Sequence, residues 1–420
     1  MNNYKITKLA NGITLATEKF ECVNSFSLGF WFKVGSRDET SKTNGISHLV
    51  EHMFFKGTKK RSAKRISEEI ESLGGYLNAF TTKEHTCYYG RGLKRNLQKT
   101  FEVLSDMIQN SLFPKKELMK EAQVVIDELK DMEDLPEELI FDKFETLIFK
   151  GNSLCLPIIG TEKNIAGFSR DDLLNYVKEK YNFNNLYIVA SGNIEHLELI
   201  KLAEKYLSNS TTTIIGNKKF IYKRKTFKPK ASKNLFVHKN IQQAHMIIGG
   251  PTYGYKHKER AVINLISNIL GEGSSSRLFI SLREQNGITY QVNSFMNSFS
   301  DTSSFGIYIS TNNNSLPKAK KIIENEFEKI KTKTVSQKEL KRAKEYIKGH
   351  LLMSLESTSN RMMRIGTSLL YMNRIKSVEE SIKEIEKVTP EDILNYSKKL
   401  LSKKNLSYVI INSKNIFNEK

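Results

Sequence analysis

Residues 169–178 read SRDDLLNYVK, and residues 389–398 read TPEDILNYSK. The two segments are 220 residues apart, and the same offset, without a gap, aligns the apolar runs that follow them, NLYIV at 185–189 and NLSYV at 405–409. Each segment begins with a Ser or a Thr, which commonly caps a helix N-terminus, and acidic residues follow in the first turn. Each copy therefore predicts a capped helix followed by a buried strand, and the repeat predicts a chain of two related halves.

A second match supports this duplication. Residues 115–122 read KKELMKEA, and residues 337–344 read QKELKRAK. The stretch between the halves is rich in Thr and Lys and contains a Gly and a Pro, as is typical of an exposed linker. The predicted organisation is an N-terminal domain at 1–210, a linker at 211–232 and a homologous C-terminal domain at 233–420.

Strand and helix patterns follow one another within the first half. Alternating apolar residues predict strands at 4–9, 13–17, 25–34, 76–82 and 86–91. Helical periodicity predicts helices at 44–55, 63–73, 93–112, 115–132 and 136–149. The fold class is therefore α+β, with two homologous α/β sandwich domains, each an antiparallel sheet with mixed edges and helices packed on one face.

Composition indicates a folded chain and excludes several classes of protein. Of the 420 residues, 39% are hydrophobic and 27% are charged, which is the balance of a globular protein rather than a disordered one. No stretch reaches the roughly 18 to 20 apolar residues of a membrane span, and the start lacks the apolar run of a secretion signal, so we expect a cytoplasmic protein without membrane insertion. The 3 cysteines are far apart, which argues against a disulfide framework or a thiolate zinc site.

The formal charge of +20 raises the question of a nucleic-acid partner. The Lys and Arg residues are, however, spread along the chain, and no aromatic-interleaved binding motif accompanies the densest runs. We therefore expect no nucleic-acid partner, and salt-sensitive binding to a generic duplex would test the opposite view.

The pentapeptide at 48–52, HLVEH, is the most informative motif in the chain. On a helix, residues four apart share a face, so His48 and His52 can present two imidazole nitrogens to one metal. Glu51 borders the same face and can reach a water molecule there. H-x-x-E-H is the signature of the inverted zinc peptidases, in which zinc activates water and a carboxylate transfers the proton to the leaving amine.

A catalytic zinc usually has three protein ligands, so a further ligand is required. The helix predicted at 115–132 offers Glu121 and Glu128, which are two turns apart and lie on one face. One of them is expected to bind the metal and the other to orient a ligand histidine. The spacing alone does not choose between them.

Taken together, these motifs resemble the pitrilysin or insulinase family of zinc peptidases, specifically its half-length branch of bacterial processing-peptidase-like proteins and the mitochondrial processing peptidase. The resemblance covers nearly the whole chain, because the inverted motif, a following Gly-Gly strand, the paired acidic residues and the second-half motif occur in order. It implies that Glu128 is the third ligand and that Glu121 is the supporting carboxylate.

The resemblance also gives a role to the strand after Gly74-Gly75. Without it, the segment is an ordinary sheet strand. In the family, an extended peptide adds to this edge strand through main-chain hydrogen bonds. Asn78, Ala79 and Phe80 are therefore the predicted substrate-contacting residues.

In the second half, Arg283 and Tyr290 stand on either side of Gly287. Unaided, they look like a surface cation and a core aromatic residue near the end of a helix. The resemblance implies a substrate-orienting pair, with Arg283 binding a peptide carbonyl and Tyr290 stabilising the oxyanion of the tetrahedral state.

The resemblance thus implies a zinc metalloendopeptidase that cleaves peptides or unfolded protein segments, with one Zn²⁺ per chain because the second half has no H-x-x-E-H. A chain that carries both the metal motif and the Arg/Tyr pair favours a homodimer enclosing a chamber. The alternative is a non-cleaving or partner-dependent subunit of the same fold.

Overall fold

The computed structural model describes residues 4–207, 214–216, 224–229 and 233–413, so most of the predicted linker lies outside the described residues. The chain forms two compact units. Unit 1 comprises Met1–Lys130, Leu156–Arg224 and Met353–Lys376. Unit 2 comprises Asp131–Cys155, Lys225–Leu352 and Ser377–Lys420. Each unit thus contains one segment from the other half of the sequence.

Unit 1 is built on a six-stranded mixed sheet with the order β1-β2-β6-β3-β5-β4. Its strands are β1 (Tyr4–Lys8), β2 (Thr14–Lys19), β3 (Ser25–Phe32), β4 (Tyr76–Thr81), β5 (Thr86–Leu93) and β6 (Leu186–Gly192). Only the β2–β6 pair is parallel, and the other neighbours are antiparallel. Strand β4 therefore forms one edge of the sheet and pairs with β5 alone among the described strands.

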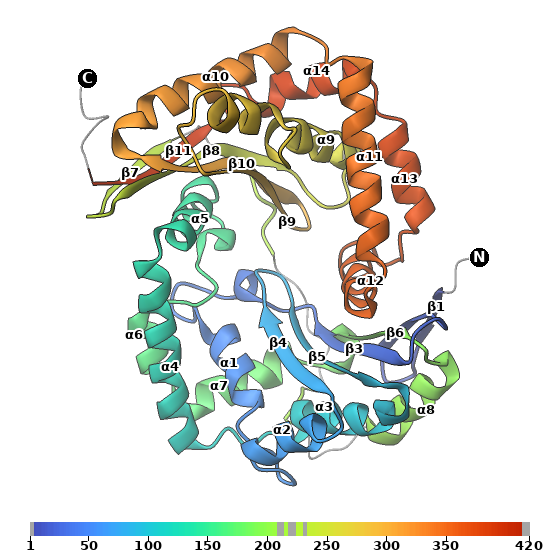
Figure 1. Cartoon of the computed structure of the whole chain (residues 1–420). Coiled ribbons are helices and arrows are strands. Elements are labelled where there is room, and N and C mark those ends of the chain that lie inside the picture. Colours follow the sequence, from blue (N-terminus) through green and yellow to red (C-terminus); the bar gives the residue numbers. More distant parts are fainter. Residues whose placement is uncertain (1–3, 208–213, 217–223, 230–232, 414–420) are drawn as a thin grey trace. The chain divides into compact units, whose positions relative to one another are not determined.

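The helices of unit 1 cover both faces of this sheet (Figure 1). They are α1 (Ile46–Phe54), α2 (Ala63–Glu71), α3 (Leu97–Asn110), most of α4 (Lys115–Asp134), α6 (Glu162–Gly167), α7 (Arg170–Lys180), α8 (His196–Tyr206) and α12 (Thr358–Met372). Strand β3 shows why both faces are needed, because its successive side chains point to opposite sides. Phe30 contacts Phe101 of α3, whereas Trp31 packs against Met362 of α12.

Unit 2 repeats the plan with a five-stranded mixed sheet of order β7-β11-β8-β10-β9. Its strands are β7 (Asn234–His238), β8 (Gln243–Tyr253), β9 (Gln291–Ser298), β10 (Thr302–Asn312) and β11 (Ser407–Asn412). Its helices are α5 (Pro136–Ile148), α9 (Arg260–Gly271), α10 (Leu316–Thr332), most of α11 (Gln337–Ser354), α13 (Val378–Glu386) and α14 (Pro390–Leu400). The parallel pair is again a single one, β7–β11.

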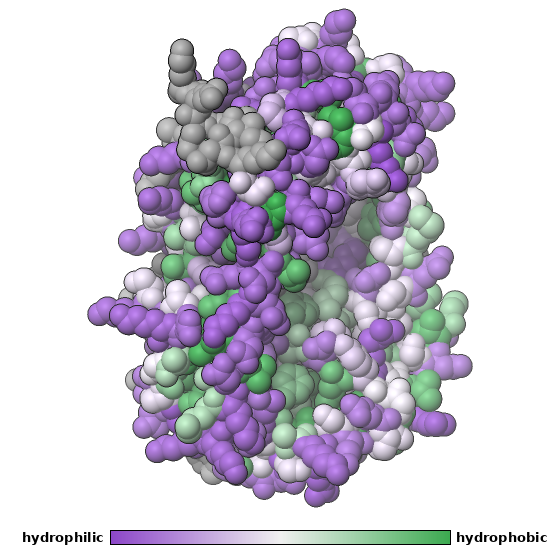
Figure 2. Space-filling model, turned by 60° about the vertical axis from the view of Figure 1, so that its left-hand side comes forward, coloured by the Kyte–Doolittle hydropathy of each residue, from purple (hydrophilic) through white to green (hydrophobic). Residues whose placement is uncertain are grey.

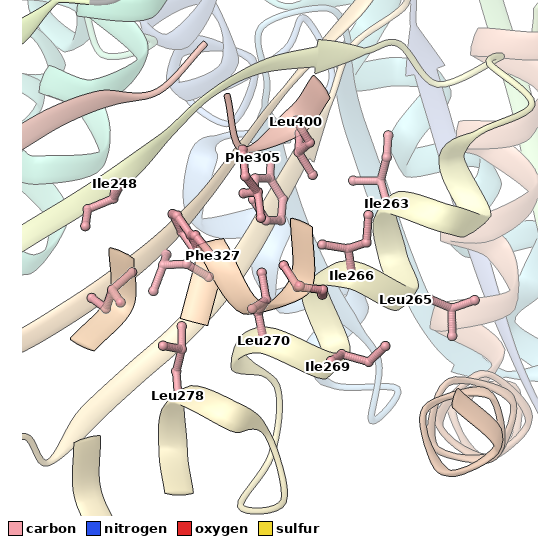
Figure 3. Packing of buried hydrophobic residues seen from close by; sticks show 14 of the residues in the cluster. Ile248, Ile263, Leu265, Ile266, Ile269, Leu270, Leu278, Phe305, Phe327 and Leu400 are labelled. Atoms are coloured by element: carbon pink, nitrogen blue, oxygen red, sulfur yellow. The ribbon is translucent and has the colours of Figure 1, made fainter. Parts of the chain in front are cut away.

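The core of unit 2 lies between one face of its sheet and helices α9, α10 and α14. Figure 3 shows Ile266 and Leu270 of α9 directed at Phe305 of the sheet and Phe327 of α10. Short 3-10 helices lie at Ser36–Asp38, Lys94–Asn96, Ser153–Cys155, Phe183–Asn185 and Asn313–Ser315, and a π-helix lies at Phe279–Glu284.

The two halves of the sequence exchange one helix each. Helix α5 comes from the first half but packs on β8 and β11, where Phe144 and Ile148 join a cluster with Ile247 and Val409. Helix α12 comes from the second half but packs on β3 and β6 of unit 1. The predicted fold class is confirmed, and this exchange adds a covering helix to the second face of each sheet.

No helix in the described part of the chain is long and apolar enough to cross a membrane. On the face shown in Figure 2, hydrophilic side chains cover most of the visible surface.

Candidate metal and catalytic site

Helix α1 has a buried apolar face and a second face that carries titratable side chains. Ile46, Leu49, Val50, Met53 and Phe54 are fully or almost fully buried. The spacing of these residues, three or four apart, is that of a helix packed against a core. The three polar residues of H-x-x-E-H occupy the remaining face and stay partly accessible. The core packing of α1 therefore fixes the direction in which the polar residues point.

Helix α4 brings a carboxylate to the two histidines of α1. Oε2 of Glu128 lies 3.9 Å from Nε2 of His48 and 3.8 Å from Nε2 of His52. One ligand atom from each of the three residues lies within 4.8 Å of the others. The structure thus brings the three predicted ligands together in unit 1, although 76 residues separate Glu128 from His52 in the sequence.

This donor set fits zinc. Two imidazole nitrogens and a carboxylate are ligands that zinc prefers, and ligand atoms around a tetrahedral zinc lie about 3.4 Å apart. The distances of 3.8 and 3.9 Å from Glu128 to the two histidines are slightly longer. Burial, together with the charge of His52, lowers the pKa of His48 to about 4. His48 is therefore neutral at neutral pH, which is the form that binds a metal.

Glu121 supports the site from the same helix as Glu128. Its Oε2 lies 3.1 Å from Nδ1 of His52, and its Oε1 pairs with Nζ of Lys56 at 2.8 Å. A hydrogen bond at Nδ1 fixes the tautomer of His52 and leaves Nε2 to face the metal position. The geometry thus gives the two carboxylates different surroundings, because Glu121 is buried whereas Glu128 is half exposed.

Glu51 is held by a residue of the edge strand. The hydroxyl of Thr81 donates to Oε2 of Glu51 at 2.5 Å. Burial raises the pKa of Glu51, and the charge of Glu128 adds to this, whereas the Thr81 hydrogen bond and the charge of His52 act in the opposite direction. A carboxylate whose pKa is raised toward neutrality is suited to accept a proton and return it.

Strand β4 presents the predicted substrate-contacting residues at the edge of the sheet beside α1 (Figure 1). The N–H of Ala79 donates to Oδ1 of Asn78 at 2.7 Å, and Nδ2 of Asn78 donates to the hydroxyl of Tyr76. Phe80 packs edge-on against Trp31. The backbone N–H of Ala79 on the edge strand is therefore hydrogen-bonded to the side chain of Asn78, and the backbone carbonyl of an incoming strand could replace that side chain.

The remaining predicted residues lie in unit 2. Arg283 belongs to the π-helix, and its guanidinium lies over the ring of Phe279, 5.0 Å from the centroid. Tyr290 precedes β9 and is 84% exposed, so it is not the core residue that its sequence context alone favours. Single π-helical turns are frequent at functional sites.

Sequence reasoning missed two residues of this site. Thr81 belongs to the strand motif, but its contact with Glu51 joins residues on separate elements and leaves no spacing signal. Lys56 follows α1 and looks like an ordinary surface lysine, although it pairs with Glu121.

Comparisons with known proteins find matches along most of the chain. Residues 14–162 match the family model of the insulinase peptidases, peptidase family M16. Residues 167–347 match the model described as the peptidase M16 inactive domain. The H-x-x-E-H motif, Glu121 and Glu128 fall in the first match, and the π-helix with Tyr290 falls in the second.

Similar full-length proteins carry related names. An uncharacterized zinc protease of Rickettsia felis is 36% identical over 97% of both chains. The uncharacterized zinc protease YmxG of Bacillus subtilis is 35% identical over 93% of this chain and 94% of its own length. The crystal structure of a Helicobacter pylori protease has the same fold, with a TM-score of 0.91 at 22% identity, covering 98% of this chain and 99% of that one.

Proposed function

Because the chain belongs to the insulinase family of M16 peptidases, we propose that it is a zinc metalloendopeptidase acting on peptides or unfolded, extended protein segments. The observation that carries the proposal is the convergence of His48, His52 and Glu128 beside Glu51. A scaffold protein would have no need to keep these four groups together and partly accessible.

Each residue of the site has a defined task. His48, His52 and Glu128 would hold one zinc ion, and Glu121 would keep His52 oriented through Nδ1. When bound, zinc polarises the scissile carbonyl and makes water a better nucleophile. Glu51 accepts the proton of the attacking water and delivers it to the leaving amine nitrogen. Thr81 holds the Glu51 carboxylate in place for both transfers.

Strand β4 would bind the substrate as an additional strand. The backbone at Asn78, Ala79 and Phe80 can form main-chain hydrogen bonds with an extended peptide, which makes little demand on its sequence. Most segments of a folded protein are already paired within that protein, so unfolded segments are the preferred substrates.

Unit 2 would contribute Arg283 and Tyr290 to the same reaction. Arg283 would bind a peptide carbonyl, and the exposed hydroxyl of Tyr290 would stabilise the oxyanion. We further propose that the protein is cytoplasmic and that it forms a homodimer. Sedimentation analysis of the purified chain would test the homodimer.

A cleavage assay on a pool of unstructured peptides tests the proposal, with wild type, Glu51→Gln and the control Glu117→Gln compared at measured zinc content. Glu117 lies on α4 like Glu128 but pairs with Lys120 instead of the metal site. We expect the wild type and the control to cut, chelation to stop both, and Glu51→Gln to keep zinc but lose activity about 10²- to 10⁴-fold. If no variant cuts while all bind one zinc per chain, the chain is a non-cleaving or partner-dependent subunit.

A further inference from the structure

Glu39 is a buried carboxylate beneath the start of α1, with only 5% of the residue exposed. Its Oε1 accepts a hydrogen bond from the N–H of Ser47 at 2.8 Å. Its Oε2 accepts from the N–H of Gly45 at 2.9 Å and from Nδ2 of Asn44 at 3.0 Å. A residue of the preceding loop thus binds two backbone amides at the N-terminus of α1.

Helix α1 needs this acceptor because its own N-cap residue is Gly45, which has no side chain. The first N–H groups of a helix have no partner within the helix, and a side-chain oxygen usually satisfies them. A capping side chain cannot easily replace Gly45, because its φ is +98° and a Cβ there would come within 2.8 Å of the carbonyl oxygen of Ile159. Glu39 supplies the missing oxygens and places an acidic group at the positive end of the helix dipole.

The capped turn is the turn that carries the first metal ligand. Ser47 immediately precedes His48, and its hydroxyl lies 2.7 Å from the hydroxyl of Tyr176 on α7. Asn44 also donates to the carbonyl of Pro157 at 2.7 Å. Glu39, Tyr176 and the loop at Pro157 therefore hold the first turn of α1 from separate directions. Loss of the Glu39 contacts would let this turn shift and would displace the imidazole of His48.

We propose that Glu39 is a positioning residue for the metal site: it holds the first turn of α1 where His48 and His52 can share one zinc and Glu51 can face it. Glu39 touches neither the proposed ligands nor Glu51, so it acts through the helix backbone. The inference rests on the proposed function for its effect on catalysis, whereas its effect on zinc affinity can be measured without any cleavage.

The test compares Glu39→Gln with Glu18→Gln. Gln keeps the shape of Glu39 but replaces one acceptor oxygen with an NH₂ group, which cannot accept from the backbone. Glu18 is an equally buried acidic residue of unit 1, 5% exposed, but it lies on β2 and pairs with Arg361 at 2.5 Å. It therefore controls for the general effect of replacing a buried acidic side chain with its amide.

Two measurements separate positioning from simple stability. Zinc affinity is measured by competition with a chelator of known affinity, and kcat and KM are measured at saturating zinc. For Glu39→Gln we expect about 3- to 10-fold weaker zinc binding, somewhat less than changes at groups that touch a ligand cause. We expect kcat to fall about 10-fold with KM nearly unchanged, because the misplaced groups act on the reacting atoms.

Zinc affinity and kcat equal to those of the wild type in a folded Glu39→Gln protein would overturn the proposal, and so would equal losses in Glu18→Gln. If wild type binds zinc but cleaves nothing, the proposed function fails, yet the zinc affinities still decide the role of Glu39. Should Glu39→Gln not fold, Glu39→Asp retains the charge with a shorter reach, and the same two measurements apply to it.

Discussion

Helices α1 and α9 occupy corresponding places in the two units, yet only α1 carries an H-x-x-E-H motif. Each follows a central strand, β3 or β8, and precedes the edge strand, β4 or β9. Helix α9 has no His, Asp or Glu, and ten of its twelve residues are buried. Helix α1 keeps one face for two histidines and a glutamate. The scaffold therefore accommodates at this position either a helix that is almost entirely buried or a helix with a partly accessible polar face.

The same contrast holds for α4 and α11. When 115–122 is aligned with 337–344, Glu121 corresponds to Ala343 and Glu128 to His350. Ala343 is buried, as Glu121 is, so the position faces inward in both helices. The second unit thus keeps the helix but lacks both carboxylates. A few side chains on two helices separate the predicted active half from its counterpart, and each can be changed singly.

The largest effect should come from making α1 resemble α9. The double change His48→Ala and His52→Ala removes two of the three proposed zinc ligands, so we expect zinc binding to be lost. Cleavage should fall by far more than the roughly 100-fold that loss of a ligand's hydrogen-bond partner can cause. Zinc content by elemental analysis and peptide cleavage measure this. His238→Ala and His257→Ala in unit 2 form the matched control, and stoichiometric zinc in the double variant of α1 would contradict the site.

A smaller effect should follow from making α4 resemble α11. Glu121→Ala copies Ala343 and leaves Nδ1 of His52 without its carboxylate partner. We expect zinc affinity to fall about 10- to 100-fold, which a chelator competition measures. Glu117→Ala on the same helix is the control. Loss of zinc binding as complete as in Glu128→Ala would instead make Glu121 a direct ligand.

A third change sharpens the role of the edge strand. Thr81→Val removes the hydrogen bond that lowers the pKa of Glu51, while the burial that raises it remains. Glu51 must be ionised to accept a proton, so activity falls as the pH drops below its pKa. We expect the acidic limb of kcat/KM against pH to move upward by about half a unit or more, with little change at alkaline pH.

The control for this prediction is Thr100→Val. The hydroxyl of Thr100 is buried in unit 1, but it donates to the carbonyl of Asn96, four residues earlier in the chain, and not to Glu51. An acidic limb that stays in place in Thr81→Val would show that Thr81 does not set the protonation of Glu51.

These comparisons show how much the sequence could predict. Apolar periodicity predicts a helix at 44–55, and α1 spans Ile46–Phe54. The H-x-x-E-H spacing predicts that the two histidines share a face, because helix geometry is local. The repeat at 169–178 and 389–398 predicts α7 and α14, and both copies form the same capping box.

Long-range packing could not be predicted in the same way. Apolar residues on α5 and α12 show that each helix is buried, but not that each covers a sheet built mainly from the other half of the sequence. The contacts from Thr81 to Glu51 and from Glu39 to α1 join separate elements, so no spacing encodes them. Sequence patterns thus identify which residues share a helix face, whereas the tertiary fold decides which faces meet.

The last predicted effect is a pH dependence of the free energy of unfolding, and it comes from Glu39 beneath the start of α1. Burial is the main influence on Glu39 and raises its pKa from 4.5 to about 7, although hydrogen bonds from Ser47 and Asn44 oppose it. Between these two pH values the folded state holds a proton that the unfolded state has released. The contribution of Glu39 to the free energy of unfolding is therefore full below pH 4.5 and declines as the pH rises toward 7, by at most about 3 kcal/mol.

Urea unfolding of the zinc-free protein from pH 4.5 to 8 would measure this decline as the difference between wild type and Glu39→Gln. The difference is needed because burial lowers the pKa of His48 and His85 to about 4, and these histidines make stability rise with pH over the same range. Both proteins share the histidine effect, so it cancels. We expect the advantage of the wild type to shrink as the pH rises to 7 and then to level off. A difference that stays constant over this range would mean that Glu39 is ionised throughout and that its backbone donors outweigh its burial.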